Sequence, residues 1–356
     1  MKNYLSNLKV IEVASVLAGP SVGMYFAERG STVLKIENKR SGGDITRSWK
    51  LPAEDKKASL SAYFCSVNWG KQHIFLDLTN ENELAVLKKE IGTADILITN
   101  FKSGDAQKFG LNFKQVSEIN PQIIHGEISG FGKNNERLAY DLILQAETGF
   151  MSINGTEDSG PVKMPVAFID LFAGHQLKEG ILEALLERNI NKKAYHVEVS
   201  LFDSAIASLA NQASNYLMTG QLPLRIGSKH PNIAPYGEIF KTRDKKLMVF
   251  AIGSDSQFNT LFELLQLEIS DQFSNNQNRL KNRSELESVI AQEVLKWSAE
   301  TLYKTLIDKK VPVALIKGID EVFDQKETSQ LILSEDLEGV PTKRVKTSVY
   351  KISSST

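Results

Sequence analysis

Asp170 is the side chain whose position in this sequence most directly suggests chemistry. It follows an apolar run, residues 164–169, and precedes a segment with helical spacing that extends to about residue 188. One interpretation is structural: its carboxylate caps the helix by accepting a hydrogen bond from a backbone N–H of the first turn. The other is catalytic: it is a nucleophile or base, held ionised by the helix dipole in a partly dry site. By position alone the cap is the commoner role, so other residues must decide between the two.

Other familiar catalytic and ligand-binding patterns are missing from the sequence. It has no G-x-G-x-x-G, no P-loop and no G-x-S-x-G. The five histidines are dispersed, without the paired spacing of metal ligands. His175 and Glu179 lie four residues apart in the expected helix. A polar helix face is the commoner outcome of that spacing, so no metal is expected.

Composition limits the kinds of partner. The formal net charge of −1 argues against a general nucleic-acid or membrane-surface binder. Cys65 is the only cysteine, so no intrachain disulfide can form, as is usual in a reducing cytosol. No apolar stretch reaches membrane-span length, and the polar first residues do not resemble a signal peptide. We therefore expect a cytoplasmic protein with no nucleic-acid or membrane partner.

The first part of the chain alternates predicted strands with predicted helices. The expected strands are residues 8–13, 31–37, 73–78, 94–99 and 121–129, and the expected helices are 20–29, 81–91 and 113–119. Thr79 is expected to cap the helix at 81–91. This alternation is typical of an α/β protein with a mostly parallel sheet covered on both faces. Ligands of such sheets bind at the carboxyl edge, so the turns that follow the strands are candidate binding segments.

The pattern changes after Asp170. A strand at 196–200 follows the long helix, a second long helix is expected at 201–218, and the loop 220–236 contains three prolines. Strands are expected at 246–252 and 311–316, with mostly helical structure between 254 and 309. The basic, Ser/Thr-rich segment 341–356 is expected to be partly disordered.

Several of the turns after strands have an unusual composition. They lie at residues 14–20, 37–44, 68–71, 94–101 and 129–132. Each is a weak signal alone. Glycines such as Gly19 commonly mark tight turns, Arg40 and Lys108 are by default solvated charges, and Tyr140 is by default a core aromatic.

Taken together and in this order, these segments resemble the class III CoA-transferase family, which includes formyl-CoA transferase and carnitine CoA-transferase. The resemblance extends from about residue 8 to about residue 353. Its most specific parts are L-A-G-P at 17–20, L-K-I-E at 34–37 with Gly43-Asp44, N-F at 100–101, A-Y-D at 139–141, and Asp170 four residues before Gly174. The segment 230–237, H-P-N-I-A-P-Y-G, is also typical of the family.

The resemblance implies that Asp170 is the nucleophile. In this family the matching carboxylate attacks an acyl-CoA to form a mixed anhydride and is then converted into an aspartyl-CoA thioester. Only a carboxylate can pass through such an anhydride, and the site must exclude water because anhydrides hydrolyse. Tyr140 is expected beside the thioester. CoA is thus a substrate, and no permanently bound cofactor is expected.

The resemblance also assigns CoA contacts to ten further residues. Val16, Leu17 and Ala18 are expected to line the pantetheine arm. The phosphates and the adenosine are assigned to the remaining seven: Arg40, Leu76, Asp77, Thr79, Asn100, Phe101 and Lys108. Cations and turn amides at the carboxyl edge of a sheet suit a polyphosphate.

Three departures from the family pattern bear on these expectations. Leu138 stands where formyl-CoA transferase carries a lysine that contacts CoA. No run of glycines occurs between residues 220 and 246, where the formyl and oxalate enzymes have a glycine-rich lid, which argues against oxalate as the acceptor. Many relatives also continue beyond the position of residue 353 with another helical segment.

The family fold implies a Rossmann-like doubly wound sheet domain, residues 1–220 completed by 325–356, and a smaller α+β domain at about 225–320. It further implies an interlocked, ring-shaped homodimer.

Two alternatives to CoA transfer remain open. An α-methylacyl-CoA racemase shares the fold but uses a His-Asp pair, and here Tyr140 replaces that histidine; tyrosine is a poor base near neutral pH. The second alternative is a non-catalytic CoA-binding protein.

Overall fold

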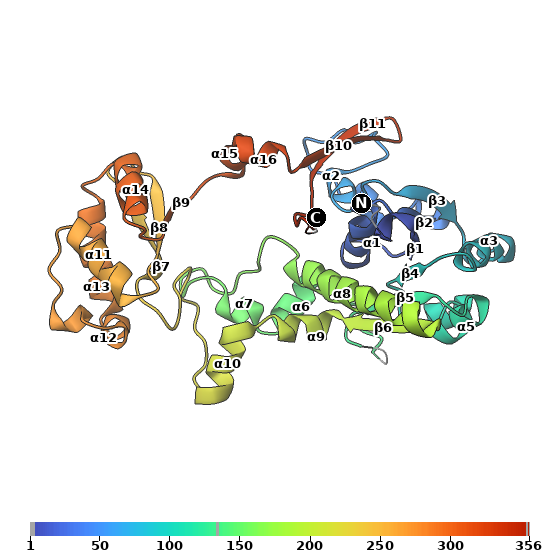
Figure 1. Cartoon of the computed structure of the whole chain (residues 1–356), viewed down its shortest axis with the longest axis horizontal. Coiled ribbons are helices and arrows are strands. Elements are labelled where there is room, and N and C mark those ends of the chain that lie inside the picture. The colour runs from blue at the N-terminus through green and yellow to red at the C-terminus, as the bar shows by residue number, and fades with distance from the viewer. Residues whose placement is uncertain (1–3, 133–134, 354, 356) are drawn as a thin grey trace. The chain divides into compact units, whose positions relative to one another are not determined.

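The computed structural model describes residues 4–132, 135–353 and 355. It divides into two compact units (Figure 1). The first contains the described residues up to Phe150, then Met164–Asn211 and those from Lys326 onward; the second contains Met151–Lys163 and Gln212–Gln325. The predicted domain boundaries, at residues 220–225 and 320–325, lie close to these, but residues 151–163 were expected in the large domain and belong to the second unit.

Six parallel strands form the sheet of the first unit, in the order β3-β2-β1-β4-β5-β6. Their bounds are β1 Lys9–Val13, β2 Thr32–Asn38, β3 Gln72–Leu76, β4 Ile96–Thr99, β5 Ile124–Ser129 and β6 Tyr195–Ser200. The order reverses between β1 and β4, as in doubly wound sheets, whose ligands bind at the carboxyl edge beside this point. The predicted parallel α/β sheet is confirmed.

Helices of the chain before residue 220 mostly connect these strands. They are α1 Ala18–Glu28, α2 Ala62–Cys65, α3 Glu81–Ile91, α4 Asp105–Phe109, α5 Phe113–Ile119, α6 Asp141–Glu147, α7 Phe150–Ile153, α8 Phe168–Asn191, α9 Leu201–Ala207 and α10 Ala210–Thr219. Short 3₁₀ turns, η1 Tyr4–Asn7, η2 Lys39–Ser41 and η3 Ile45–Ser48, lie in the first part of the chain.

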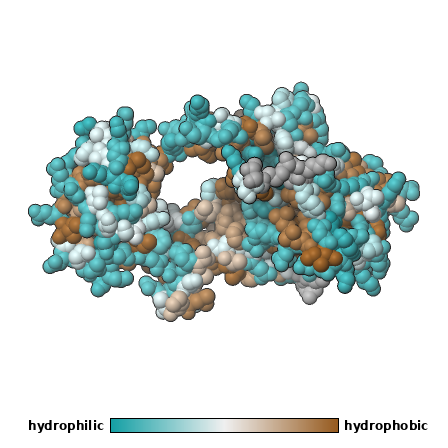
Figure 2. All heavy atoms as spheres, viewed as in Figure 1, coloured by the Kyte–Doolittle hydropathy of each residue, from teal (hydrophilic) through white to brown (hydrophobic). Residues whose placement is uncertain are grey.

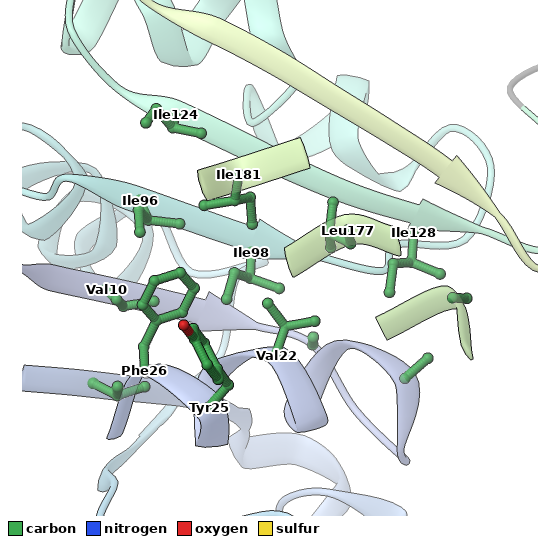
Figure 3. Close-up of a cluster of buried hydrophobic side chains, with 14 of the residues drawn as sticks. Val10, Val22, Tyr25, Phe26, Ile96, Ile98, Ile124, Ile128, Leu177 and Ile181 are labelled. Carbon is green, nitrogen blue, oxygen red and sulfur yellow. The ribbon is translucent and has the colours of Figure 1, made fainter. Parts of the chain in front are cut away.

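Each face of the sheet packs against its own pair of helices. Val10 and Ile98 of the sheet belong to a core with side chains of α1 and α8, whereas Ile11 and Leu97 belong to a second core with α3 and α5. Figure 3 shows the first core, with α1 and α8 side chains over the strands. Because successive strand residues point to opposite faces, strands covered on both sides bury apolar side chains in both cores, as Val10 and Ile11 of β1 do.

Helices α1 and α8 approach each other closely at Gly174. A Cβ atom at this position would lie 3.1 Å from the carbonyl oxygen of Ala18, tighter than ordinary contacts. The glycine therefore allows the start of α8, with Asp170, to lie beside the start of α1.

Two sequence predictions about helices are wrong. Helix α3 is capped by Asn80, whose side chain accepts hydrogen bonds from the N–H groups of Asn82 and Glu83, and not by Thr79. Thr79 instead donates to the carboxylate of Asp77 in the preceding turn. The helix predicted at 201–218 is broken into α9 and α10, where Ala210 takes a left-handed backbone conformation with φ of 47°.

The C-terminal segment is more ordered than predicted. After α16, Lys326–Ser329, strands β10 Ile332–Leu337 and β11 Val340–Val345 form an antiparallel hairpin. Glu28 of α1 then accepts hydrogen bonds from the Arg344 side chain and from the backbone N–H groups of Thr347 and Ser348. These contacts fix residues 344–348 to the first unit, so the prediction of disorder is wrong there.

The second unit has its own sheet and core. Strands β7 Tyr236–Lys241, β8 Leu247–Ala251 and β9 Val313–Leu315 are antiparallel. The helices of this part are α11 Asp255–Leu264, α12 Asn276–Lys281, α13 Arg283–Val294, α14 Ala299–Asp308 and α15 Ile319–Phe323, with the 3₁₀ turn η4 Asp271–Phe273. The predicted short strand at 311–316 is present as β9, whereas β7 was not predicted.

Apolar side chains on and after α10 are exposed. Leu217, Met218, Leu222 and Leu224 are each at least 70% exposed in the single chain. Figure 2 shows apolar spheres among those at the end of this helix, at the bottom of the view. Within the described residues, no helix is both long enough and apolar enough to cross a membrane.

Candidate active site

A cavity of about 660 Å³ opens at the carboxyl edge of the sheet in the first unit. It is lined by the turn after β1, the turn after β4, the end of β5, residues 135–140 before α6 and the start of α8. Seven of the predicted site residues contribute to its wall, namely Val16, Leu17, Ala18, Asn100, Phe101, Tyr140 and Asp170. Residues from four separate segments therefore meet where a doubly wound sheet binds its ligand.

Asp170 faces this cavity from the first turn of α8. The residue is 7% exposed, and among the described residues no hydrogen bond or ion pair reaches its carboxylate oxygens. Burial, together with the negative charge of Asp141, raises the pKa of Asp170 to about 7. A buried carboxylate without a partner is costly to ionise, and it is unusual unless the group is used by a ligand or a reaction.

The helix is capped by Asp141 and not by Asp170. Helix α8 begins at Phe168, so Asp170 lies inside the first turn, and its side chain makes no cap hydrogen bond. The carboxylate of Asp141 accepts from the N–H of Ile169 at 2.9 Å and from the N–H of Asp170 at 3.4 Å. The structural interpretation of Asp170 is therefore wrong, and its carboxylate is left available for other chemistry.

The turn after β1 has a strained backbone. Val16 has a φ of 73°, a region that β-branched residues rarely adopt and that costs on the order of 1–3 kcal/mol. The side-chain amide of Asn100 clasps the preceding residue: it accepts from the Ser15 N–H at 3.0 Å and donates to the Ser15 carbonyl at 2.8 Å. The polar atoms of Asn100 thus hold this turn, a use that the sequence analysis did not foresee.

The other predicted CoA contacts lie along the same edge but outside the wall of the cavity. Arg40 follows β2, and Leu76, at the end of β3, pairs with Asn38 at the end of β2. The charge of Arg40 contributes to lowering the pKa of Asp77, although hydrogen bonds from Thr79 are the larger cause. Lys108 of α4 lies over the ring of Phe109, which in turn contacts Phe101. The predicted residues therefore form two groups at one edge.

Tyr140 and Leu138 are both exposed to the cavity. Tyr140 is 52% exposed and precedes α6, so the default interpretation of a buried core aromatic is wrong. Leu138 is 68% exposed. An apolar side chain thus lies in the wall of the cavity at this position.

Sequence reasoning missed several neighbours of Asp170 and of the cavity. Arg137 lines the cavity, lies over the ring of Phe131 at 4.2 Å and pairs with Glu147. Tyr63 of α2 is half-buried, and burial and nearby carboxylates, first that of Asp170, raise its pKa to about 12. Only the basic residue next to Leu138 could have been singled out from the sequence; the place of Tyr63 depends on tertiary packing.

Side chains that could hold a metal are few. Within the described part of the chain, one group of ligand-type side chains gathers, Glu127, His196 and Glu198 of β5 and β6, with ligand atoms within 4.8 Å of one another. The His196 ring stacks on Phe113, and its Nε2 lies 3.1 Å from Glu127. His175 and Glu179 were predicted to belong to an ordinary polar helix face. Nδ1 of His175 lies 2.8 Å from the ammonium nitrogen of Lys178 on the same helix.

The first unit is a doubly wound α/β domain with a cavity at the carboxyl edge of its sheet, and the Asp170 carboxylate lies in the wall of that cavity. The chain belongs to CoA-transferase family III, whose family model matches residues 5–355. It is therefore a CoA-transferase, an enzyme that acts on CoA thioesters.

Individual relatives share most of their length with this chain. Over 347 residues it is 36% identical to a succinate–glutarate CoA-transferase of Agrobacterium fabrum, covering 95% of this chain and 86% of that protein. It is 30% identical to an acetyl-CoA:oxalate CoA-transferase of Acetobacter aceti, covering 98% and 90%. A CaiB/BaiF family protein of Brucella suis has a similar structure, with a TM-score of 0.83, 34% identity and coverage of 99% and 93%.

Proposed function

We propose that the enzyme moves CoA from a dicarboxylic acyl-CoA to a second dicarboxylic acid, with Asp170 as the nucleophile. The observation that carries this proposal is the Asp170 carboxylate, buried, without a partner among the described residues and facing the cavity. Burial disfavours its charged form, and desolvation strengthens a nucleophile once it is ionised.

The proposed reaction proceeds through two kinds of covalent intermediate on Asp170, a mixed anhydride and a CoA thioester. A carboxylate oxygen attacks the thioester carbonyl, the C–S bond breaks, and CoA leaves as a thiolate. The thiolate attacks the Asp170 carbonyl of the mixed anhydride, which releases the first acid and leaves an aspartyl-CoA thioester. The acceptor carboxylate then attacks this thioester, the C–S bond breaks, and a second mixed anhydride forms with release of the CoA thiolate. The thiolate attacks the acceptor carbonyl of this anhydride, so that a new acyl-CoA leaves and the Asp170 carboxylate is regenerated.

Backbone groups beside Asp170 can stabilise the tetrahedral oxyanions. Asp141 already occupies the first N–H groups of α8, but α1 begins at Ala18 in the wall of the same cavity. We assign the oxyanion contacts to the first N–H groups of α1, at Ala18 and Gly19, which have no acceptor within the helix and carry the positive end of its dipole.

We assign the two ends of CoA to the two groups of predicted contact residues at the sheet edge, one in the cavity wall and one outside it. The reactive end would lie against Val16, Leu17 and Ala18, next to Tyr140, and the nucleotide would extend toward the β2 and β3 turns with Arg40 and Lys108. This assignment is supported by the cavity lining and by the shared carboxyl edge. Arg137 is proposed to supply the cation that Leu138 lacks, because it lines the cavity one residue away.

A dicarboxylic substrate pair is supported by the relatives. Succinate, glutarate and oxalate, which appear in the names of two relatives, each carry two carboxyl groups, whereas the acetyl group in the second name comes from a monocarboxylic acid. The missing glycine run between residues 220 and 246 favours succinate or glutarate over oxalate. We therefore expect succinyl-CoA as donor and glutarate as acceptor.

We also propose the interlocked, ring-shaped homodimer that the family resemblance implies, with a large and a small domain in each chain. The exposed apolar residues of α10 and the segment after it support an assembly, because a single chain leaves them in water.

We also propose a cytoplasmic location, which is supported by the single, buried Cys65.

The alternatives are distinguished by trapping. The racemase hypothesis needs Asp141 or its neighbour as a base, but the Asp141 carboxylate is engaged by the N–H of Ile169 and by the Gln145 amide. Purified enzyme should be incubated with succinyl-CoA, glutarate and hydroxylamine, in ordinary and in deuterated water. An aspartyl hydroxamate at Asp170 with glutaryl-CoA as product is the expected result. Deuterium at the α-carbon without transfer would indicate a racemase, and neither product would indicate a binding protein.

A further inference from the structure

The left-handed backbone of Val16 is held by a buried carboxylate. Val16 N–H lies 3.2 Å and 3.3 Å from the two carboxylate oxygens of Asp44, to which it donates a hydrogen bond. Asp44 lies on the turn after β2 and is 5% exposed. This contact restrains the single residue of the turn whose conformation is strained, in the wall of the cavity that Asp170 faces.

Asp44 is itself fixed by a buried lysine. The ammonium of Lys35 lies 3.1 Å from Asp44 and 2.9 Å from Glu12, and it donates to the carbonyl oxygen of Ala14 at 2.7 Å. Although burial alone would lower it, the carboxylates of Glu12 and Asp44 raise the pKa of Lys35, so it stays charged. Lys35 therefore binds the backbone of Ala14 directly, and it also binds the Asp44 carboxylate that accepts a hydrogen bond from Val16.

A second lysine extends the network to α1. The ammonium of Lys71 lies 2.7 Å from the other oxygen of Glu12 and donates to the Pro20 carbonyl at 2.9 Å. Two carboxylates and two ammonium groups thus balance their charges beneath the turn. The L-K-I-E and Gly-Asp motifs at residues 34–37 and 43–44 contribute Lys35 and Asp44, and neither side chain lines the cavity.

We propose that Asp44, oriented by Lys35, is a positioning residue for CoA transfer: it forces Val16 into the conformation in which the turn meets the thioester end of CoA. The inference rests on the proposed function for the identity of the ligand. The network has a role beyond stabilising the core. Its hydrogen bonds reach the backbone of residues 14, 16 and 20, and not only other side chains, so it also restrains the shape of the turn.

The test compares Asp44→Ala with Glu28→Ala. Glu28 is a matched control, since it is also a buried carboxylate paired with a cation, Arg344, but it holds the C-terminal segment. Both variants should lose stability. Asp44→Ala should lower kcat about 10- to 100-fold with a smaller change in KM, as expected for a misplaced reactive group, whereas Glu28→Ala should keep kcat. Equal losses of kcat in the two folded variants would overturn the proposal.

A second substitution tests the link to Val16. Glycine adopts positive φ without strain, so Asp44→Ala should reduce kcat several-fold less in a Val16→Gly background than in the natural one. The same fold loss in both backgrounds would contradict the proposal. If Asp44→Ala alone does not fold, the double variant should fold; failure of both would assign Asp44 to core stability only.

Hydrogen exchange separates this inference from the proposed function. Exchange of the Val16 amide should be faster in Asp44→Ala than in Glu28→Ala, whatever reaction the enzyme catalyses. Faster exchange in a protein that transfers no CoA would contradict the proposed function alone. Unchanged exchange of the Val16 amide would overturn the positioning role alone.

Discussion

The carboxylate of Asp141 caps the helix that carries Asp170, with its oxygen 2.9 Å from the N–H of Ile169. This places a negative charge next to the carboxylate of Asp170, which has no hydrogen-bond or ion-pair partner among the residues that the structure describes. The charge of Asp141 is, after burial, the second cause that raises the pKa of Asp170 to about 7. Asp141 thus caps helix α8 and also raises the pKa of Asp170, the carboxyl group that this helix places in the cavity wall.

Asp141→Asn should shift the pH profile of transfer to lower pH. Asparagine keeps an oxygen acceptor for Ile169 but removes the negative charge, so the pKa of Asp170 should fall. We expect the acid limb of kcat/KM to move by roughly half to one pH unit. Loss of stability alone would lower activity without moving the limb, so an unchanged midpoint in a folded variant would contradict the role of Asp141.

Asp170→Asn should stabilise the ligand-free protein at neutral and higher pH. The pKa of Asp170 rises from 3.8 to about 7 on folding, so the folded state binds this proton more tightly than the unfolded state. The wild type therefore loses stability as the pH rises from below 4 through about 7, whereas the asparagine variant does not lose this contribution. The upper limit of the difference is about 4 kcal/mol, three pKa units at about 1.36 kcal/mol each.

Thermal unfolding of both proteins between pH 4 and pH 8 (roughly the window set by the pKa shift) measures this effect. The two proteins should converge at the acid end and diverge toward the alkaline end. A constant difference across the range would show that Asp170 does not titrate in it.

Arg40→Ala, Lys108→Ala and Arg137→Ala should each weaken CoA binding about tenfold, and dephospho-CoA or pantetheine thioesters less. The loss should shrink at high salt, because an exposed cation–phosphate contact is screened. Lys9→Ala is the control, since Lys9 starts β1 at the opposite edge of the sheet and pairs with Glu90. Equal losses for all three ligands would show that a residue does not contact a phosphate.

Gly23→Ala should destabilise the first unit by about 1–3 kcal/mol, despite the higher helix propensity of alanine. An added Cβ at this position of α1 would overlap the Glu12 carboxylate in the buried charge network. The midpoint of urea unfolding measures the effect. Gly92→Ala at the end of α3 is the control, because a Cβ there meets only ordinary contacts. Equal stability of both variants would contradict the tight packing at Gly23.

Local patterns in the sequence predicted the parallel sheet well. Strands buried on both faces contain short continuous apolar runs, such as residues 96–98 of β4, and the helices between the strands have clear periodicity. The hairpin at Ile332–Val345 was missed because the middle of each strand is polar, S-E-D in one and T-K-R in the other, and because Pro341 is unfavourable in most strands. The hairpin contacts the rest of the first unit through residues far apart in sequence, such as Arg344 with Glu28 and Glu338 with Arg47.

The site was predictable only in part. Family motifs drew attention to Asp170, Val16 and Tyr140, and the structure brings these residues to one cavity. The sequence could not reveal that the helix cap comes from Asp141 on a different helix, because that contact depends on tertiary packing. For the same reason Asn100, a residue expected to contact the nucleotide, was not recognised as the clasp of the Ser15 backbone.

The most direct test of the account is mass analysis of the enzyme during turnover. The protein should be mixed with succinyl-CoA without an acceptor acid, quenched in acid, digested and mapped by mass spectrometry. We predict CoA attached through a hydroxylamine-sensitive thioester to the peptide that contains Asp170, and no such adduct in the folded Asp170→Asn variant. Rapid CoA transfer to glutarate by the Asp170→Asn variant, or an adduct on a different residue, would contradict the assignment of Asp170 as the nucleophile.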